Sequence, residues 1–271
     1  MHVDRVREFH RLHQSGCFVI PNPWDVGSAR LLARLGFKAM ATTSSGFAWS
    51  QGLPDNGVSL AAALAHFQAI AASVEVPVNG DFEGGFAVEP DRVSGHVALA
   101  AATGIAGLSI EDSTGDPDAP LFDFTLAVER VRAASRAIAD GGTSVLLTGR
   151  SEGFIVGRPD LKETIRRLVA YADAGAECVY APGLRALDDI AEVVRAVSPR
   201  PVNVLVGGDF ATVSQLAGVG VRRISVGGAL ARAAWTGFLR AATEIAERGT
   251  FSALGGAVPF AEIDGAFRAR D

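Results

Sequence analysis

Cysteine is scarce in this chain of 271 residues, which contains only Cys17 and Cys178. The two cysteines show neither the spacing of a metal site nor the framework of a disulfide-rich fold, so neither class of protein is indicated. Each cysteine lies in or beside an apolar run. We therefore expect buried, reduced thiols in core strands, where free cysteine is commonly found.

Long apolar runs and a strong excess of positive charge are also absent. No run of eighteen or more apolar residues occurs, and residues 1–8 contain no apolar signal region. The sequence therefore predicts neither export nor membrane insertion, and we expect a cytoplasmic protein. The formal net charge of −5 argues against nucleic acid or an anionic membrane as the main partner.

Histidine is missing from the positions where it would support catalysis. His10, His13, His66 and His96 all fall within predicted helices, and no histidine follows a predicted strand. We therefore expect surface or packing roles for these residues. The pattern disfavours a histidine general base and does not support a Ser-His-Asp arrangement.

The chain does contain a repeated unit: an amphipathic helical stretch, a turn with glycine, and a short apolar run that ends in polar residues or glycine. The predicted strands cover residues 17–20, 38–43, 76–79, 107–110, 144–148, 177–180, 201–206 and 223–226. The predicted helices cover residues 3–14, 26–35, 59–72, 90–103, 125–139, 160–173, 185–197, 210–217 and 229–247.

Eight such units in a chain with 48% hydrophobic residues indicate one large core. Near-continuous apolar strands are typical of parallel sheets that are covered on both faces. We therefore predict a single α/β domain over residues 1–271, a (β/α)8 TIM barrel. An open doubly wound sheet is the alternative, although no Gly-x-Gly-x-x-Gly follows the first strand. The helical extension from about residue 229 lies beyond the eighth strand and is expected to cover the barrel or a neighbouring subunit.

Carboxylates gather where the third and fourth predicted strands end. Asp81 and Glu83 follow one strand and point to the same side of an extended chain, and Glu111 follows the next. Because active sites of parallel barrels lie at the carboxyl ends of the strands, we expect these side chains to meet there. Helix capping explains a single carboxylate more easily than three. The sequence therefore predicts a Mg²⁺ site formed by Asp81, Glu83 and Glu111.

Other polar residues follow other predicted strands. The stretch Ser44–Phe47 is either an ordinary turn or a set of N–H and hydroxyl donors for an acidic group. Arg150 is either a structural ion-pair partner or a bidentate hold on a substrate carboxylate or phosphonate. Asp55 lies in the loop after the second strand, and Asn203 lies in the seventh strand. We expect both residues in the site.

Five segments, in the order of the family, resemble the isocitrate lyase/phosphoenolpyruvate mutase superfamily. They are PNPWDVGSA at 21–29, TSSGF at 43–47 with GLPD at 52–55, GDFEGG at 80–85, SIEDS at 109–113 and TGRSE at 148–152. The resemblance implies a Mg²⁺-dependent barrel that acts on α-oxo acids, their enolates or phosphonates. It places Asp55 with the three metal carboxylates and implies catalytic roles for Asp55, Glu111 and Arg150. The residues expected to bind the substrate are Ser45, Gly46, Phe47, Arg150 and Asn203.

Two departures from the family pattern narrow the expected reaction. Lyases of this superfamily carry a Lys-Lys/Arg-Cys-Gly loop after strand four whose cysteine acts as acid and base. Residues 114–122 here read TGDPDAPLF, with neither cysteine nor lysine, and the Lys-Asn pair of the phosphonomutase loop is also absent. Glu83 stands where better-known members have aspartate. Cleavage of isocitrate or methylisocitrate by the usual route is therefore not expected.

The sequence thus predicts a Mg²⁺-dependent lyase or mutase that cleaves or rearranges a C–C or P–C bond through an enolate. The substrate would be a small α-oxo acid, 2-hydroxy acid or phosphonate, and decarboxylation of an oxaloacetate-like acid needs no catalytic cysteine. The alternatives are a phosphoenolpyruvate or carboxyphosphonoenolpyruvate phosphonomutase and a non-catalytic oxo-acid-binding protein. Such families exchange the last helix between subunits, so the resemblance also implies a dimer or tetramer.

Overall fold

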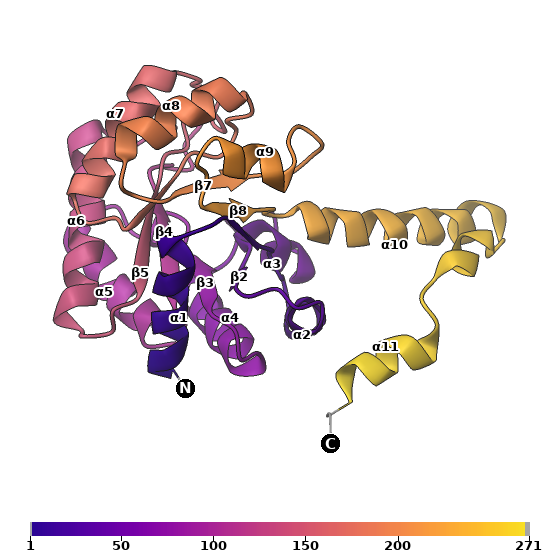
Figure 1. The fold of residues 1–271 in the computed structure, drawn as a ribbon. Helices are drawn as coiled ribbons and strands as arrows, with labels where there is room; N and C mark the ends of the chain where they lie inside the picture. Colours follow the sequence, from indigo (N-terminus) through magenta and orange to yellow (C-terminus); the bar gives the residue numbers. More distant parts are fainter. Residues whose placement is uncertain (1, 269–271) are drawn as a thin grey trace.

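The computed structural model describes residues 2–268 and contains eight short strands that alternate with helices (Figure 1). The strands are β1 (Phe18–Ile20), β2 (Met40–Ala41), β3 (Val78–Asp81), β4 (Gly107–Glu111), β5 (Leu146–Arg150), β6 (Cys178–Tyr180), β7 (Val202–Leu205) and β8 (Arg223–Ser225). All assigned ladders between them are parallel. The predicted strands are confirmed to within a few residues.

Eleven α-helices and one short 3-10 turn lie outside the sheet within residues 2–268. Up to β8 the helices are α1 (His2–Gln14), α2 (Val26–Arg34), α3 (Ser44–Ser50), α4 (Leu60–Ser73), α5 (Pro90–Ala101), α6 (Phe124–Asp140), α7 (Leu161–Asp173), α8 (Leu187–Val197) and α9 (Val213–Gly218). After β8 follow α10 (Ala229–Arg248), the 3-10 turn η1 (Ser252–Gly256) and α11 (Phe260–Phe267). The nine predicted helices are confirmed to within a few residues, and α3, η1 and α11 lie outside the predicted ranges.

The sheet is a nearly closed barrel. Neighbouring strands are hydrogen bonded in the order β1-β8-β7-β6-β5-β4-β3-β2. A hydrogen bond of 3.1 Å from the Ala41 N–H to the Pro21 carbonyl then joins β2 to the end of β1. This order confirms the predicted (β/α)8 barrel and excludes the open doubly wound sheet.

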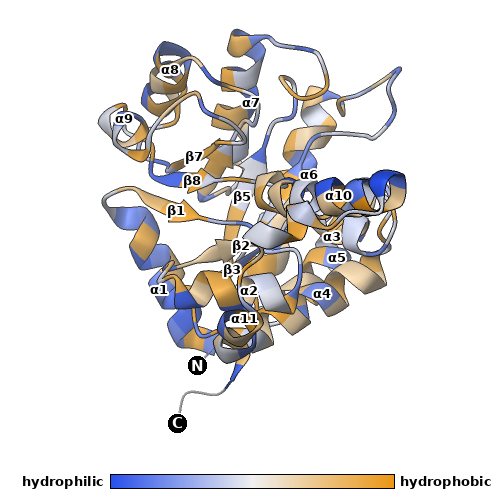
Figure 2. Ribbon diagram, turned by 90° about the vertical axis from the view of Figure 1, so that its right-hand side faces the viewer, coloured by the Kyte–Doolittle hydropathy of each residue, from blue (hydrophilic) through white to orange (hydrophobic). Residues whose placement is uncertain are grey.

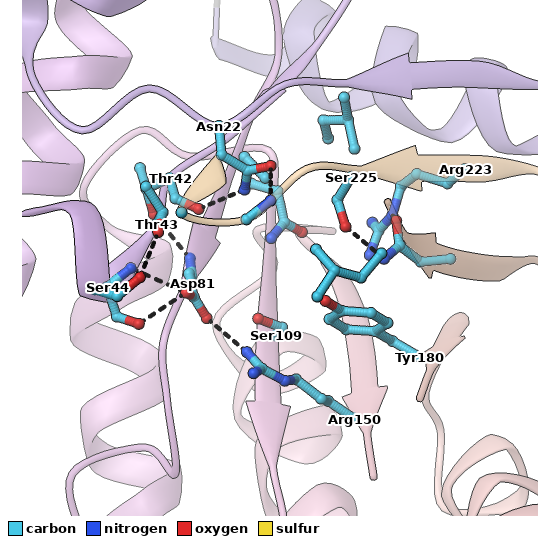
Figure 3. Close-up of a pocket in the computed structure, with 18 of the residues that line it drawn as sticks. Asn22, Thr42, Thr43, Ser44, Asp81, Ser109, Arg150, Tyr180, Arg223 and Ser225 are labelled. Atoms are coloured by element: carbon cyan, nitrogen blue, oxygen red, sulfur yellow. Dashed lines mark hydrogen bonds and ion pairs between the residues drawn. The ribbon is translucent and has the colours of Figure 1, made fainter. Parts of the chain in front are cut away.

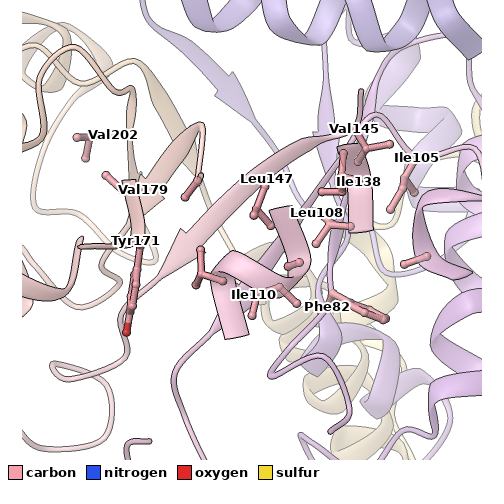
Figure 4. Packing of buried hydrophobic residues seen from close by; sticks show 14 of the residues in the cluster. Phe82, Ile105, Leu108, Ile110, Ile138, Val145, Leu147, Tyr171, Val179 and Val202 are labelled. Atoms are coloured by element: carbon pink, nitrogen blue, oxygen red, sulfur yellow. The ribbon is translucent and has the colours of Figure 1, made fainter. Parts of the chain in front are cut away.

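The main hydrophobic core lies between the strands and the surrounding helices. Figure 4 shows part of it, where Leu108, Ile110 and Leu147 of β4 and β5 lie in one cluster with Ile138 of α6. These three strand residues are at most 1% exposed. Burying a leucine or isoleucine of this kind stabilises the fold by about 1.5–3 kcal/mol, so this layer holds the strand ends in place.

Glycine ends the helices where the sequence predicted it. Gly175 follows α7 with a φ of 111°, in the left-handed region that other residues avoid. A Cβ atom at this position would also collide with the Ser135 side chain on α6. The helix must therefore end here, and the chain turns directly into β6.

Helix α1 packs against the barrel through a second, smaller cluster. Val6 and Phe9 of α1 lie there with Ile20, Leu146 and Cys178 from three strands. Cys178 is fully buried, as predicted. Cys17 is only partly buried, because it precedes β1 and lies outside the barrel wall.

Residues 229–268, which we call the C-terminal arm, leave the barrel after β8. Helix α10 points away from the barrel, η1 reverses the chain, and α11 returns beside α2 (Figures 1 and 2). There the Arg34 guanidinium donates to the carbonyls of Gly265 and Ala266 at 3.3 and 3.0 Å. None of the helices described within residues 2–268 has the length and apolar character needed to cross a membrane.

Candidate active site

Arg150 joins the carboxylates that the strands bring to one end of the barrel. Its Nη1 lies 3.2 Å from Asp81 Oδ1 (Figure 3) and 3.0 Å from Glu111 Oε2, and its Nε donates to Glu152. The register explains the meeting, because Glu111 on β4 is paired with Arg150 on β5. The structure therefore brings together Asp81, Glu111 and Arg150, three residues predicted from the ends of different strands. Asp81 and Arg150 are 69 residues apart in the sequence.

Asp81 is held from its other side by the start of α3. The N–H and the hydroxyl of Ser44 each donate to Asp81 Oδ2 at 3.0 Å, and the Asp81 N–H donates to Thr42 Oγ1 at 2.9 Å. A carboxylate at a helix N-terminus is stabilised by the unpaired N–H groups there. The orientation of Asp81 is thus fixed without any ligand.

The Ser44–Phe47 stretch is the first turn of α3 and not an isolated loop. Ser45 lines the central cavity, and Gly46 is buried where a Cβ would press on Thr43, Trp24 and Ala231. The Phe47 ring stacks on His66 with centroids 3.9 Å apart, and the Phe47 N–H donates to the Thr43 carbonyl. Ser45 therefore faces the cavity, whereas the structure does not bring Phe47 into its lining.

Glu83 and Asp55 lie near Asp81 and add to the group of carboxylates at this end of the barrel, which we call the acidic mouth. Burial, reinforced by Asp81 and then Asp55, raises the pKa of Glu83 to about 7. Burial and the charge of Asp81 also raise the pKa of Asp55. Glu83 adopts a φ of 47°, a left-handed conformation that is costly for a residue with a side chain. Strain and like charge in the same loop are typical of functional sites.

Burial also acts on the two carboxylates nearest Arg150. It raises the pKa of Glu111 well above its ordinary value and raises that of Glu152, although Arg150 opposes both shifts. The single guanidinium therefore does not balance the negative charge around it. A further cation would lower each of these pKa values.

The chemistry of these donors fits a hard cation, but no ready coordination set is present. Within residues 2–268, no three Asp, Glu, His or Cys side chains are grouped closely enough to hold a metal ion. Mg²⁺ usually binds through one or two carboxylates and keeps several waters, so Asp81 with one neighbour would suffice. The ligand set Asp81, Glu83 and Glu111 remains a prediction.

Asp112, the residue after Glu111, is the centre of a buried network. It accepts hydrogen bonds from the Glu152 N–H at 2.7 Å, from Arg167 at 3.1 Å and from the Tyr171 hydroxyl at 2.6 Å. A carboxylate with three partners is well compensated in a buried position. Asp112 thus fixes the end of β4 and with it the position of Glu111.

The central cavity runs from this mouth into the barrel and has a volume of about 170 Å³. Ser45, Asp55, Asp81, Arg150 and Asn203 line it. Asn203 donates to Ser225 Oγ at 2.9 Å and accepts from Arg223 Nε at 2.9 Å (Figure 3). Of the predicted residues, Asn203 therefore lies deepest, away from the carboxylates.

Two residues of this region were missed by the sequence analysis. Thr42 precedes the predicted Ser44–Phe47 motif, and a hydroxyl at the end of an apolar strand was a usable signal for it. Arg223 is the first residue of β8 and is 3% exposed, and a charged residue is rarely so deeply buried. Its presence there could have indicated a polar barrel interior.

Comparisons with known sequences agree with the fold. The family model for phosphoenolpyruvate phosphomutase matches residues 9–246. An uncharacterised Mycobacterium tuberculosis protein, Rv1998c, is 36% identical over 228 residues, which are 81% of each chain. An oxaloacetate decarboxylase of Pseudomonas savastanoi pv. phaseolicola is 29% identical over 206 residues, covering 73% of this chain and 69% of its own.

Solved structures show the same architecture. A Burkholderia cenocepacia J2315 protein, described provisionally as a lyase/mutase, is 48% identical with a TM-score of 0.95, covering 100% of this chain and 98% of its own. Oxaloacetate acetylhydrolase in complex with oxalate has a TM-score of 0.86 at 22% identity, covering 97% and 94% of the two chains. The second likeness is one of fold.

The barrel with its acidic strand ends has the architecture of the Burkholderia cenocepacia protein described as a lyase/mutase. The chain belongs to the phosphoenolpyruvate phosphomutase family. The resemblance drawn from its five motifs is thereby confirmed.

Proposed function

We propose that the protein is a Mg²⁺-dependent lyase that breaks a C–C bond of a small α-oxo acid, with decarboxylation of an oxaloacetate-like acid as its simplest reaction. The observation that carries the proposal is the Arg150 cluster, in which Asp81 and Glu111 meet at the mouth of the cavity. The similarity to an oxaloacetate decarboxylase supports the same reaction.

Asp81, Glu83 and Glu111 would hold the cation, directly or through water. When bound, Mg²⁺ would supply the positive charge that stabilises an enolate. Ser44 keeps Asp81 in one orientation through two hydrogen bonds. This orientation is set before the substrate arrives, so no rearrangement is needed during the reaction.

Ser45 and Arg150 would bind and orient the substrate's acidic group, since both line the cavity. When the C–C bond breaks, its electron pair stays on the α-oxo fragment as the enolate, and carbon dioxide leaves. The enolate carbon must then take up a proton. Asp55 also lines the cavity and has a raised pKa, so its carboxyl group is suited to hold that proton.

Turnover assays with a panel of acids test this function. The panel contains oxaloacetate, phosphonopyruvate and 2-methylisocitrate, each with Mg²⁺ and with EDTA. We expect oxaloacetate decarboxylation only with Mg²⁺. We expect Asp81→Asn to reduce kcat/KM by at least about 100-fold. Asp91→Asn, on the first turn of α5, serves as the matched control and should retain activity.

The other outcomes of this panel identify the alternatives. Turnover of phosphonopyruvate alone would make the protein a phosphonomutase. Binding of the acids without turnover of any of them would make it an oxo-acid-binding protein. Activity that persists in EDTA would contradict the role of Mg²⁺.

We also propose that the C-terminal arm mediates assembly of a dimer or tetramer by helix exchange. Of the twenty residues of α10, Ala231 alone is buried. The large apolar side chains exposed on the arm include Phe238, Leu239, Phe251, Leu254, Val258 and Phe260. An isolated helix with so little burial is not stable by itself, so a second copy of the chain is the natural cover for it.

A further inference from the structure

A second arginine lies at the inner part of the central cavity. Arg223 is 3% exposed, and its side chain points into the barrel from β8 (Figure 3). Its Nε donates to Asn203 Oδ1 at 2.9 Å and its Nη2 donates to Thr148 Oγ1 at 3.1 Å. Its Nη1 lies 3.3 Å from His13 Nε2. These contacts engage three of the five N–H groups of the guanidinium.

The surroundings of Arg223 are neutral. Burial, and then the charge of Arg223, lowers the pKa of His13 to about 3, so the imidazole is uncharged and accepts the hydrogen bond at Nε2. The His13 Nδ1–H donates to the Phe9 carbonyl at 2.7 Å, which fixes this tautomer. Within residues 2–268, none of the hydrogen-bond partners of Arg223 is a carboxylate. A buried cation without an anion is costly, and an anionic ligand would offset that cost.

The two arginines of the cavity therefore differ in whether carboxylates neutralise their charge. Arg150 already has three carboxylate partners, Asp81, Glu111 and Glu152, so a substrate acid that binds it shares the guanidinium with them. Arg223 is not matched, yet it lines the same continuous cavity. An acidic group that enters past the carboxylates at the mouth is thus drawn toward the inner end.

Other polar groups line the same part of the cavity. Asn203 and Ser225 lie beside Arg223 and are joined to each other by a hydrogen bond of 2.9 Å. Asn79 also lines the cavity, and its buried Oδ1 has no hydrogen-bond partner in the described structure. This part of the cavity is therefore polar, whereas side chains inside such barrels are mostly bulky and apolar.

We propose that Arg223 binds a second carboxylate of the substrate and so selects dicarboxylic over monocarboxylic acids. This inference rests on the proposed function, in which the α-oxo acid end of the substrate lies at the carboxylates of the mouth. The far carboxylate then reaches inward, where Arg223 matches its charge and Ser225 can donate a hydrogen bond. A cavity of about 170 Å³ admits only a small acid.

Binding of a matched pair of acids to the wild-type protein tests the proposal without any mutation. L-malate and 2-hydroxybutyrate share the 2-hydroxy acid end, and they differ in whether the chain ends in a carboxylate or a methyl group. Calorimetry in the presence of Mg²⁺ should show malate binding at least about tenfold more tightly, because a hydrogen bond between charged groups contributes about 1.5–3 kcal/mol. Equal affinities for the two acids would overturn the proposal.

Two variants locate the effect at Arg223. Arg223→Gln should reduce the malate affinity at least about tenfold and change the 2-hydroxybutyrate affinity less than about threefold. Asn203→Asp places a carboxylate on the Arg223 Nε, supplies the missing charge internally and should have the same selective effect. It also pairs the buried cation, so it remains informative if Arg223→Gln does not fold. Arg222→Gln is the control, since Arg222 is the neighbouring residue and bonds the Gly16 carbonyl at the surface.

The results separate this inference from the proposed function. A malate preference that survives in both Arg223→Gln and Asn203→Asp would overturn the role of Arg223, whatever the enzyme catalyses. A preference that both variants abolish would support it, even if no acid in the turnover panel reacts. With oxaloacetate as substrate, Arg223→Gln should raise KM without lowering kcat, because the far carboxylate loses its charge as it leaves as carbon dioxide, and Arg223 therefore stabilises the bound substrate more than the transition state.

Discussion

Arg150 should contribute more to the stability of the fold than an ordinary ion-pair residue, because it pairs with three carboxylates. Glu111 and Glu152 are buried beside it, and Asp81 is largely buried. Arg150→Gln leaves these groups without their cation. We expect a loss of about 3–5 kcal/mol in the free energy of unfolding, measured by urea denaturation at neutral pH without metal.

The matched control for this prediction is Arg166→Gln. Arg166 pairs with Glu163 on the surface of α7, with the side chains 56% and 34% exposed. Exposed pairs contribute about 0–1 kcal/mol, so this variant should be nearly as stable as the wild type. Similar losses in both variants would show that the Arg150 cluster adds nothing to stability.

His13 makes the stability depend on pH in the acidic range. Its pKa is lowered to about 3 in the folded protein by burial and then by Arg223, while the unfolded chain retains the ordinary value of 6.5. Between these values the unfolded state binds the additional proton. Stability from this residue is therefore present above pH 6.5 and is lost as the pH falls toward 3.

Urea denaturation at pH 7, 5.5 and 4.5 measures the contribution of His13. His13→Gln removes the titrating group and keeps an acceptor for Arg223. The wild type should lose up to about 2–3 kcal/mol more than the variant between pH 7 and pH 4.5. Parallel pH profiles for the two proteins would contradict the assignment.

Gly46 is required by space and not by backbone conformation. A Cβ there would lie 2.7 Å from Thr43 Cγ2 and 3.0 Å from Trp24 Cβ. Gly46→Ala should cost about 1–3 kcal/mol of stability and displace the start of α3, which orients Asp81. In α5, a Cβ at Gly95 has no neighbour within 4 Å, so Gly95→Ala should instead stabilise by about 0.5–1 kcal/mol. Thermal unfolding of both variants checks the opposite signs.

At the scale of elements, most of the barrel followed from local signals in the sequence. Apolar runs, helical periodicity and glycines after helices are each contained in a few consecutive residues, and they predicted every strand. The helix α3 was missed because its sequence, SSGFAWS, has low helix propensity. Its position depends on Thr43 as the cap and on Asp81, which is 37 residues from Ser44.

The candidate site was predictable only in part, for a related reason. The strand ends identified Asp81, Glu111 and Arg150, because the barrel brings all strand ends to one face. The partners of Asp112 lie 55 and 59 residues further along the chain, on α7. Arg223 meets His13 across 210 residues. Contacts of this length depend on how helices and strands pack, and no local pattern contains them.

The C-terminal arm leads to a prediction about assembly. Phe238 and Leu239 on α10 are 59% and 57% exposed. If a second copy covers them, replacing both by glutamate should convert the oligomer to monomers, as measured by light scattering after gel filtration. Leu99→Glu on α5 is the control, because Leu99 is 53% exposed on the barrel itself and should tolerate the charge. A wild-type monomer at micromolar concentration would refute helix exchange.

At the scale of the whole molecule, ligand binding and stability are linked. Mg²⁺ together with oxalate should raise the melting temperature, because both would bind the folded mouth and not the unfolded chain. At 100 times the dissociation constant the gain is about 2.7 kcal/mol, or roughly 5–10 °C for a chain of this size. Asp81→Asn should abolish the shift in differential scanning fluorimetry. A shift of equal size in that variant would place the binding elsewhere.

The anchoring of Asp112 has a consequence for how this barrel can diversify. Residues 113–121 form a loop whose two ends lie side by side. The Phe122 N–H donates to the Asp112 carbonyl at 2.9 Å, and Ser113 pairs with Leu121. The loop between these two ends can therefore vary while its ends stay in place. Exchanging it for a stretch of another length or reactivity leaves the flanking carboxylates where they are, so new chemistry can be grafted onto this scaffold through a single replacement.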